Sequence, residues 1–194
     1  MERFTLTKAA FPDAWRGYKL NTDFHTVLTI LAALNDPELS GAEKIMIARK
    51  RLFTGDAPEA GEVMDAFIWF ESCGVAREEN EPDAARDFDF EQDAREIYAS
   101  FFQVYGIDLM RPLHWWAFSA LLDGVTAVPC ALLEKLRLRH MDDSRAQADA
   151  ALERAKRAAA IEDAISLTDR ARDDALRWRL AEGLPFDDLL EGEP

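Results

Sequence analysis

The residues of this chain best suited to acid–base, nucleophilic or metal chemistry are separated from one another in sequence. They are three histidines and two cysteines: His25, His114, His140, Cys73 and Cys130. Catalysis or metal binding by such residues is usually marked by close spacing, as in H-E-x-x-H or paired C-x-x-C motifs. Neither spacing occurs, so we expect these side chains to have structural or surface roles. His114, which precedes two tryptophans, is the histidine that most merits inspection.

The sequence also lacks the common motifs for cofactor binding and nucleophilic catalysis. It contains no G-x-G-x-x-G turn, no G-x-x-x-x-G-K-[ST] phosphate loop and no G-x-S-x-G nucleophile elbow. One series of carboxylates superficially resembles a calcium-binding loop: Asp83, Asp87, Asp89, Glu91 and Asp93. It lacks the glycine needed at the sixth position, and a cluster of acids at the start of a helix explains it better. We therefore predict no catalytic residue, no cofactor and no metal site.

Composition and charge describe an acidic globular protein and restrict its partners. Of 194 residues, 48% are hydrophobic and 31% are charged, and the formal net charge is −14. Affinity for nucleic acid or anionic lipid rests mostly on Lys and Arg, so we expect neither as a partner. No apolar run reaches the roughly 18 residues of a membrane span, and the first residues lack the apolar segment of a secretory signal. We expect a soluble protein in a reducing compartment.

The densest group of large apolar side chains lies at residues 97–116 and should form the centre of the fold. Burying one such side chain stabilises a protein by roughly 1.5–3 kcal/mol, so this stretch is expected in the core. Its spacing predicts a helix that ends at Gly106 and a second helix that begins near Pro112 and stops at residues 123–124. A short turn at 107–111 would join them into a helical hairpin.

Apolar residues at helical spacing predict further helices around this hairpin, near residues 24–34, 40–52, 59–73 and 129–140. Candidate residues for capping the helix starts are Asn21, Thr22 or Asp23, then Ser40 with Glu43, and Asp87 or Asp89. Turn signals before residue 18 allow a short N-terminal β-hairpin. The predicted fold class is mainly α: a compact multi-helix body around the central hairpin, followed by an extended C-terminal helix and tail.

The texture of the sequence changes near residue 141, where we place the domain boundary. Residues 1–140 would form the helical body, and residues 141–194 an Ala/Arg/Asp-rich helical appendage with an acidic–hydrophobic C-terminal segment. That segment carries six candidate partner-binding anchors: Trp178, Leu180, Leu184, Phe186, Leu189 and Leu190. It resembles a docking segment that becomes ordered on a partner, and the alternative is that it packs back onto the body.

Three segments together carry a family resemblance: YKLNTDF at 18–24, IYASFFQVYGIDL at 97–109 and LHWWAF at 113–118. They are similar to the bacteriophage gene-product-fifteen family of siphophages and prophages. The resemblance spans about residues 6–140. His25 departs from the pattern of the family, which usually has Arg at that position, and no catalytic residues come with the resemblance.

The resemblance implies a tail assembly chaperone, because members of the family are encoded between the tail-tube and tape-measure proteins. Such a chaperone would bind the tape-measure protein and tail-tube subunits during tail morphogenesis, in the cytoplasm of the bacterial host. It would also self-associate weakly and perform no catalysis. The alternative function is a structural tail-completion or connector subunit that is retained in the virion.

Overall fold

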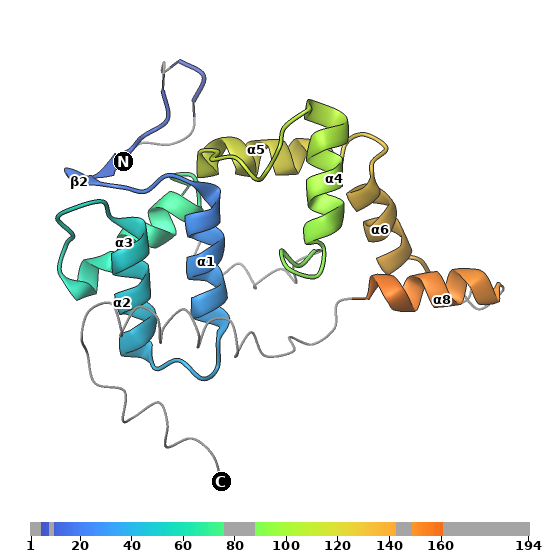
Figure 1. The fold of residues 1–194 in the computed structure, drawn as a ribbon, viewed down its shortest axis with the longest axis horizontal. Coiled ribbons are helices and arrows are strands. Elements are labelled where there is room, and N and C mark those ends of the chain that lie inside the picture. The colour runs from blue at the N-terminus through green and yellow to red at the C-terminus, as the bar shows by residue number, and fades with distance from the viewer. Residues whose placement is uncertain (1–4, 8–9, 76–87, 143–148, 161–194) are drawn as a thin grey trace, which may run out of the picture.

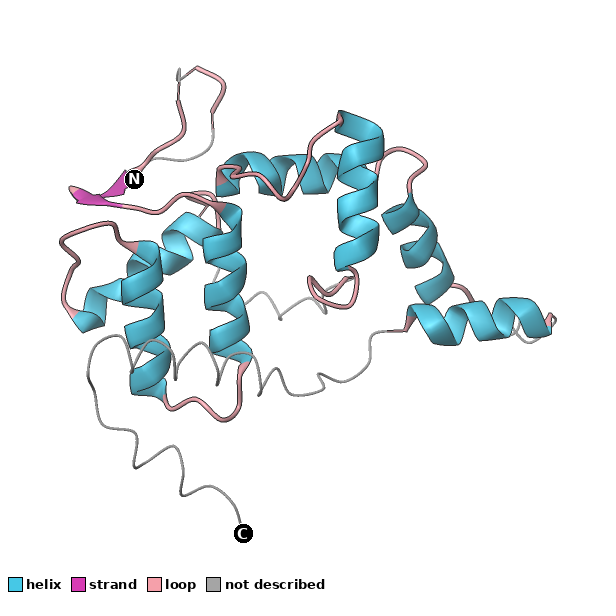
Figure 2. Ribbon diagram, viewed as in Figure 1, coloured by secondary structure: helices cyan, strands magenta, loops and turns pink. Residues whose placement is uncertain are grey.

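The computed structural model describes residues 5–7, 10–75, 88–142 and 149–160, and in these ranges the chain is mainly helical (Figure 1, Figure 2). The described helices are α1 (Phe24–Asn35), α2 (Gly41–Leu52), α3 (Ala60–Glu71), α4 (Ala94–Tyr105), α5 (Trp115–Val125), α6 (Ala131–Arg139) and α8 (Ala150–Ala159). Two short antiparallel strands, β1 (Ala14–Trp15) and β2 (Tyr18–Lys19), precede them. The predicted mainly α fold class is confirmed, including the short β-hairpin, and the predicted C-terminal tail lies outside the described residues.

Local signals fix the ends of the first helices, as the sequence predicted. The Asp23 carboxylate accepts a hydrogen bond from the backbone N–H of His25 and caps α1. Ser40 and Glu43 form a capping box at the start of α2, with each side chain accepting from the other residue's backbone N–H. Arg16 and Gly17 form the two-residue loop of the β-hairpin, and both have positive φ, as the tight turns of such loops require.

Helices α1, α2 and α3 pack in sequence order, and α5 spans from the start of α1 to α4 (Figure 1). On α1 the fully buried positions are Val27 and Ile30, whereas Leu28, Leu31 and Leu34 are half-buried against the core. The helix predicted near residues 24–34 is therefore present, and Val27 and Ile30 lie at the centre of its buried face.

The central pair of helices is present, but the second helix begins later than expected. Gly106 ends α4 with a left-handed φ of 66°, as predicted. The expected start near Pro112 is wrong, because α5 begins at Trp115. Backbone hydrogen bonds from Phe24 to Leu113 and from Trp115 to Thr22 hold this connection extended against the entry to α1. Tertiary pairing thus overrides the local signal.

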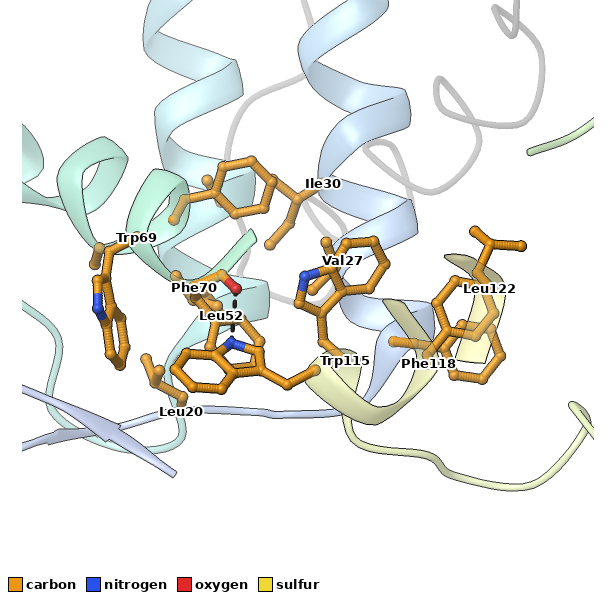
Figure 3. Close-up of a cluster of buried hydrophobic side chains, with 14 of the residues drawn as sticks. Leu20, Val27, Ile30, Leu52, Trp69, Phe70, Trp115, Phe118 and Leu122 are labelled. Carbon is orange, nitrogen blue, oxygen red and sulfur yellow. Dashed lines mark hydrogen bonds between the residues drawn. The ribbon is translucent and has the colours of Figure 1, made fainter. Parts of the chain in front are cut away.

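Aromatic rings from four helices fill the core. Figure 3 shows those of Trp69 and Phe70 on α3 and of Trp115 and Phe118 on α5. The ring of Phe118 on α5 stacks on Phe24 of α1 at 4.4 Å and on Phe101 of α4 at 5.2 Å between centroids. The indole N–H of Trp116 donates to the carbonyl of Phe70 at 2.9 Å, and that of Trp115 donates to the carbonyl of Glu71 at 2.8 Å. The hairpin is buried at the centre of the fold, as expected.

Beyond the hairpin, α6 packs on α4 and α8 packs on α6. Arg139 on α6 donates from Nε to the carbonyl of Ala159 at 2.7 Å, and Lys156 on α8 donates to the carbonyl of Met141. The described helix of the expected appendage, α8, therefore contacts the body. The division at residue 140 stays a prediction. No described helix has the length and apolar character needed to cross a membrane.

Gly124 provides a test of the packing between α4 and α5. A Cβ atom there would lie 2.9 Å from the hydroxyl of Tyr105, which donates to the carbonyl of Leu121. We expect Gly124→Ala to lower the free energy of unfolding by about 1 kcal/mol, although Ala normally favours a helix by about 1 kcal/mol over Gly. In a Tyr105→Phe background the same change should become stabilising, as measured by urea unfolding.

The control is Gly61→Ala in α3, where an added Cβ would meet nothing within 4 Å. It should stabilise the protein in both backgrounds by up to about 1 kcal/mol. An effect of Gly124→Ala that is identical with Tyr105 and with Phe at position 105 would contradict the predicted contact.

Candidate functional site

His114, the histidine singled out by the sequence, uses both ring nitrogens in structural hydrogen bonds. Its Nδ1 accepts from the backbone N–H of Trp116 at 3.1 Å and so caps α5, while Nε2 donates to the carbonyl of Pro12 at 3.1 Å. The ring also stacks on Phe11 at 4.8 Å. Burial lowers the pKa of His114, and the carbonyl of Pro12 and the charge of Asp13 oppose this shift only in part. These bonds need the neutral ring, so His114 acts as a cap.

Trp115 and Tyr98 do not join His114 around a shared cavity. The Trp115 side chain is buried against the end of α3, where its N–H is hydrogen-bonded. Tyr98 stacks on Phe102 of the same helix, and its hydroxyl donates to Asp108 at 3.2 Å. The three side chains therefore contact different parts of the fold.

The remaining chemically capable side chains are equally committed to structure or lie at the surface. Burial raises the pKa of the Cys73 thiol to about 11, so it remains a protonated, weakly nucleophilic thiol at neutral pH. Cys130 is buried and donates to the carbonyl of Val125. His25 is exposed and pairs with Asp23, and His140 ends α6. In the described ranges, no group of three or more His, Cys, Asp or Glu could hold a metal ion.

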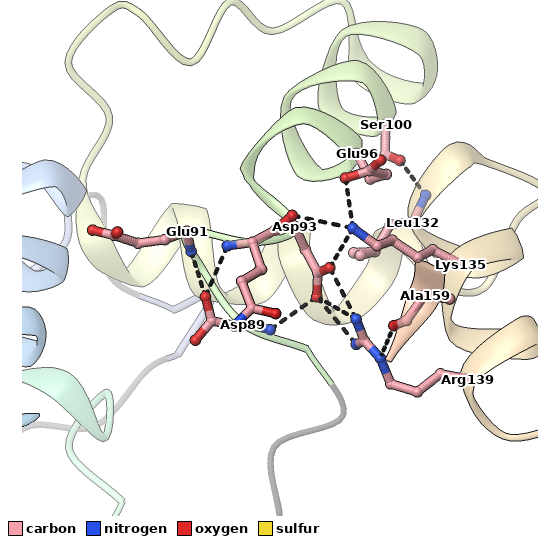
Figure 4. Close-up of polar contacts among 10 residues, drawn as sticks. Asp89, Glu91, Asp93, Glu96, Ser100, Leu132, Lys135, Arg139 and Ala159 are labelled. Atoms are coloured by element: carbon pink, nitrogen blue, oxygen red, sulfur yellow. Dashed lines mark hydrogen bonds and ion pairs between the residues drawn. The ribbon is translucent and has the colours of Figure 1, made fainter. Parts of the chain in front are cut away.

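The most concentrated polar site in the described residues is an ionic cluster around Asp93, shown in Figure 4. The Asp93 side chain, which precedes α4, is 0% exposed. Its carboxylate accepts from Arg139 at 2.9 and 3.1 Å and pairs with Lys135 Nζ at 2.7 Å, and it also accepts from the backbone N–H of Asp89. Lys135 contacts Glu96 as well, at 3.2 Å. This cluster joins the start of α4 to α6.

Opposite charges keep this cluster ionised although it is buried. Burial alone would raise the pKa of Asp93, but the hydrogen bonds from Arg139 and Lys135 outweigh it and lower that pKa. For Lys135, burial acts to lower the pKa, and the contacts with Asp93 and Glu96 raise it instead. A carboxylate saturated by two cations and a backbone N–H has no free position for a proton or a substrate, so the cluster is suited to holding helices together.

Sequence reasoning placed the members of this cluster in other roles. Asp89 and Asp87 were expected to cap the helix. Instead, Asp89 accepts from the backbone of Glu91 and Gln92 and caps a turn before α4; residue 87 lies outside the described residues. One signal was available: Asp93 precedes Ile97 and Phe101 at spacings of four, which places it on the buried face of the helix.

The six predicted partner-binding residues, Trp178, Leu180, Leu184, Phe186, Leu189 and Leu190, lie outside the described residues. The basic residues Arg49, Lys50 and Arg51 are exposed in the last turn of α2, where their charges suit the negative end of the helix dipole.

Comparison with known proteins identifies the family. The family model described as "Bacteriophage Gp15 protein" matches residues 14–161. The chain belongs to the bacteriophage Gp15 family. The match continues past residue 140, where the expected resemblance stopped, and includes α8, which packs on the Gp15 body. No curated protein and no solved structure matches this chain. Family membership makes it a phage structural or morphogenesis protein.

Asp93→Ala should show how strongly the ionic cluster holds α4 to α6. Removing the carboxylate leaves the largely buried Arg139 and Lys135 without their partner, so we expect the free energy of unfolding to fall by about 3–5 kcal/mol. The measurement is urea unfolding followed by circular dichroism, with Asp93→Asn as a milder variant that keeps the side-chain volume.

The matched control is Arg137→Ala, which removes an exposed ion pair with Glu134 on the same helix. It should cost less than about 1 kcal/mol. Equal losses from Arg137→Ala and Asp93→Asn would contradict the importance of burial in the cluster.

His114→Asn should remove one component of the pH dependence of stability. The folded-state pKa of His114 lies below its unfolded value near 6.5, so the unfolded chain binds the proton first as pH falls. Stability contributed by the neutral ring is therefore present above about pH 6.5 and decreases as pH falls towards the folded-state pKa. Asn can still accept from the N–H of Trp116, so the variant should keep the cap and lose this dependence.

The measurement compares urea unfolding at about pH 7.5 and about pH 5, around the unfolded pKa of histidine. A wild-type pH dependence that survives in His114→Asn would show that the ring does not titrate as expected.

Proposed function

We propose that this Gp15-family protein is a tail assembly chaperone that binds the tape-measure protein and tail-tube subunits during phage tail morphogenesis. The observation that carries the proposal is the family match over residues 14–161, which includes every described helix. The protein would act in the cytoplasm of the host bacterium, through binding alone and without catalysis.

The described side chains are consistent with a protein that works through its surfaces. The side chains that could perform acid–base or nucleophilic chemistry have structural roles instead. His114 caps a helix, Cys73 is packed as a protonated thiol, and the Asp93 cluster joins two helices. A net charge of −14 disfavours nucleic acid as the partner and suits proteins with basic surfaces. A client such as the tape-measure protein, which is largely helical, could be bound by apolar helix faces.

The C-terminal segment is the natural candidate for the second partner. The last four of its six anchors lie among the carboxylates of Glu182, Asp187, Asp188 and Glu191, and residues 181–194 contain no Lys or Arg. The six anchors are Trp178, Leu180, Leu184, Phe186, Leu189 and Leu190. Such a segment can bury its apolar side chains on a partner while its carboxylates meet basic groups at the rim. We therefore assign tail-tube subunits to this segment and the tape-measure protein to the helical body.

Co-expression with the tape-measure and tail-tube proteins of the same phage tests this assignment. A tagged full-length chain should capture both proteins. Leu189→Asp/Leu190→Asp should reduce capture of the tube protein at least about tenfold, since each buried Leu contributes roughly 1.5–3 kcal/mol, and should leave capture of the tape-measure protein unchanged. Glu182→Gln, near the same end of the chain, is the control and should capture both.

Two results would reject parts of the proposal. Unchanged capture of the tube protein by the Leu189/Leu190 variant would remove the role given to the C-terminal segment. Mass spectrometry of purified virions addresses the chaperone role, because a chaperone leaves before the particle is complete. Stoichiometric amounts of the chain in virions would favour the alternative, a structural tail-completion or connector subunit.

A further inference from the structure

The outward side of α4 presents large apolar side chains that the described fold does not cover. We call this surface the α4 outer face and define it by the exposed residues Ala99, Phe102 and Met110, with Tyr98 partly buried at its edge. Phe102 on α4 is 58% exposed, and Met110 in the loop after α4 is 73% exposed. Ile97 and Phe101 of α4 point into the core instead. The rings of Tyr98 and Phe102 lie parallel, 8° apart, with centroids separated by 6.4 Å.

Hydrogen bonds hold the loop that carries Met110 beside the helix. The Asp108 carboxylate accepts from the Tyr98 hydroxyl at 3.2 Å and from the backbone N–H of Met110 at 2.9 Å. The two aromatic rings and the loop are therefore positioned before any partner binds. A preorganised apolar surface loses little conformational entropy when it is covered.

Cations border this face although the chain as a whole is strongly acidic. Arg95 is exposed one helical turn before Tyr98, and Arg111 follows Met110 and is 83% exposed at its side chain, with a long 3.8 Å pair to Asp108. The acidic residue of the first turn, Glu96, pairs with Lys135. The face therefore suits an occupant that combines apolar anchors with carboxylates.

The chain itself contains such an occupant. Residues 184–191 carry four apolar anchors and three carboxylates and have no cation: Leu184, Phe186, Leu189 and Leu190 with Asp187, Asp188 and Glu191. A second copy is a weaker candidate, because three or four exposed apolar side chains fall well short of the ~800 Å² that each partner buries in a standard interface.

The end of α8 lies close to the start of α4 through shared contacts. Arg139 binds the carbonyl of Ala159, at the end of α8, and also the carboxylate of Asp93, which precedes α4. From there, the 23 residues of 161–183 span roughly 75 Å if extended and about 35 Å if helical. Both lengths exceed the ~15 Å radius of gyration expected for a body of this size, so residues 184–191 can reach the face in the same chain.

We propose that the α4 outer face is the docking surface for residues 184–191 of the same chain. This inference rests on the proposed function, in which the same segment binds tail-tube subunits, and it implies that a tube subunit must displace the segment from α4. A tether of this kind gives an effective concentration near the millimolar range, so a contact too weak to form between separate chains forms within one.

Photo-crosslinking of the full-length chain without partners tests the proposal. The photoreactive amino acid p-benzoylphenylalanine replaces Phe102, whose exposure allows the larger ring. Irradiation should give an adduct that migrates as a single chain and maps by tandem mass spectrometry to residues 184–191. Its yield should not change on about tenfold dilution, because the contact is intramolecular. The same probe at Ile68, which is 48% exposed on α3, should give no adduct with that segment.

Two sets of substitutions test the chemistry of the contact. Leu189→Asp/Leu190→Asp should abolish the adduct, and Arg95→Glu should reduce its yield about two- to fivefold, as expected for loss of an exposed charge pair. An adduct that links two chains, an adduct that maps to another segment, an equal adduct from position 68, or no adduct would each overturn the proposal.

Failure here is distinguishable from failure of the proposed function, because the crosslinking uses no partner. Loss of the proposed contact with normal capture of the tube protein would reject the docking on α4 alone. Normal crosslinking without capture of the tube or tape-measure protein would reject the chaperone assignment and leave the docking surface in place.

Discussion

Trp115 and Trp116, at the start of α5, constrain how α5 packs against α3. Both bury an indole N–H group in the core, and each group needs a hydrogen-bond acceptor there. A buried donor without an acceptor costs about 1–3 kcal/mol, so burial of Trp115 and Trp116 together is favoured where two acceptors are available. The carbonyls of Phe70 and Glu71 lie in the last turn of α3, where the helix ends before a residue four positions later can donate to them. They supply the two acceptors. The start of α5 is thereby fixed against the end of α3, and the stacking of Phe118 on α1 and α4 follows from that placement.

The Asp93 cluster fixes the position of α6 against the start of α4. Buried ion pairs contribute little net stability compared with well-packed apolar groups, because desolvation offsets most of the attraction. They do penalise wrong arrangements, since displacing α6 would leave a buried carboxylate or two cations unpaired. Ser100 strengthens this placement by accepting from the backbone N–H of Leu132 at the start of α6. The stacking of Phe118 on Phe101 and the Asp93 cluster contact α4 on two of its sides. The α4 outer face is the side that remains available for contact.

Features set by local chemistry could be predicted from the sequence, and features set by distant contacts could not. Asp23, Ser40 and Gly106 act at helix ends because a short side chain or a left-handed backbone is needed there, whatever lies nearby. The cap of α5 was missed because a histidine ring nitrogen takes the acceptor role and because residues 22–24 hold the preceding segment extended. Likewise, no local pattern pairs Asp93 with Arg139, which lies 46 residues later.

The family match and the described packing both include α8 with the helices before it. The match stops at residue 161, directly after the helix whose last carbonyl Arg139 holds. That bond does more than lengthen the body: it makes one side chain the shared partner of the α8 end and of the carboxylate that begins α4. The end of α8 therefore lies near the start of α4, and in the docking proposed for residues 184–191 the 23 residues of 161–183 serve as the tether to the α4 outer face. The tether raises the effective concentration of the segment at the α4 outer face, so the proposed contact can form although it is weak.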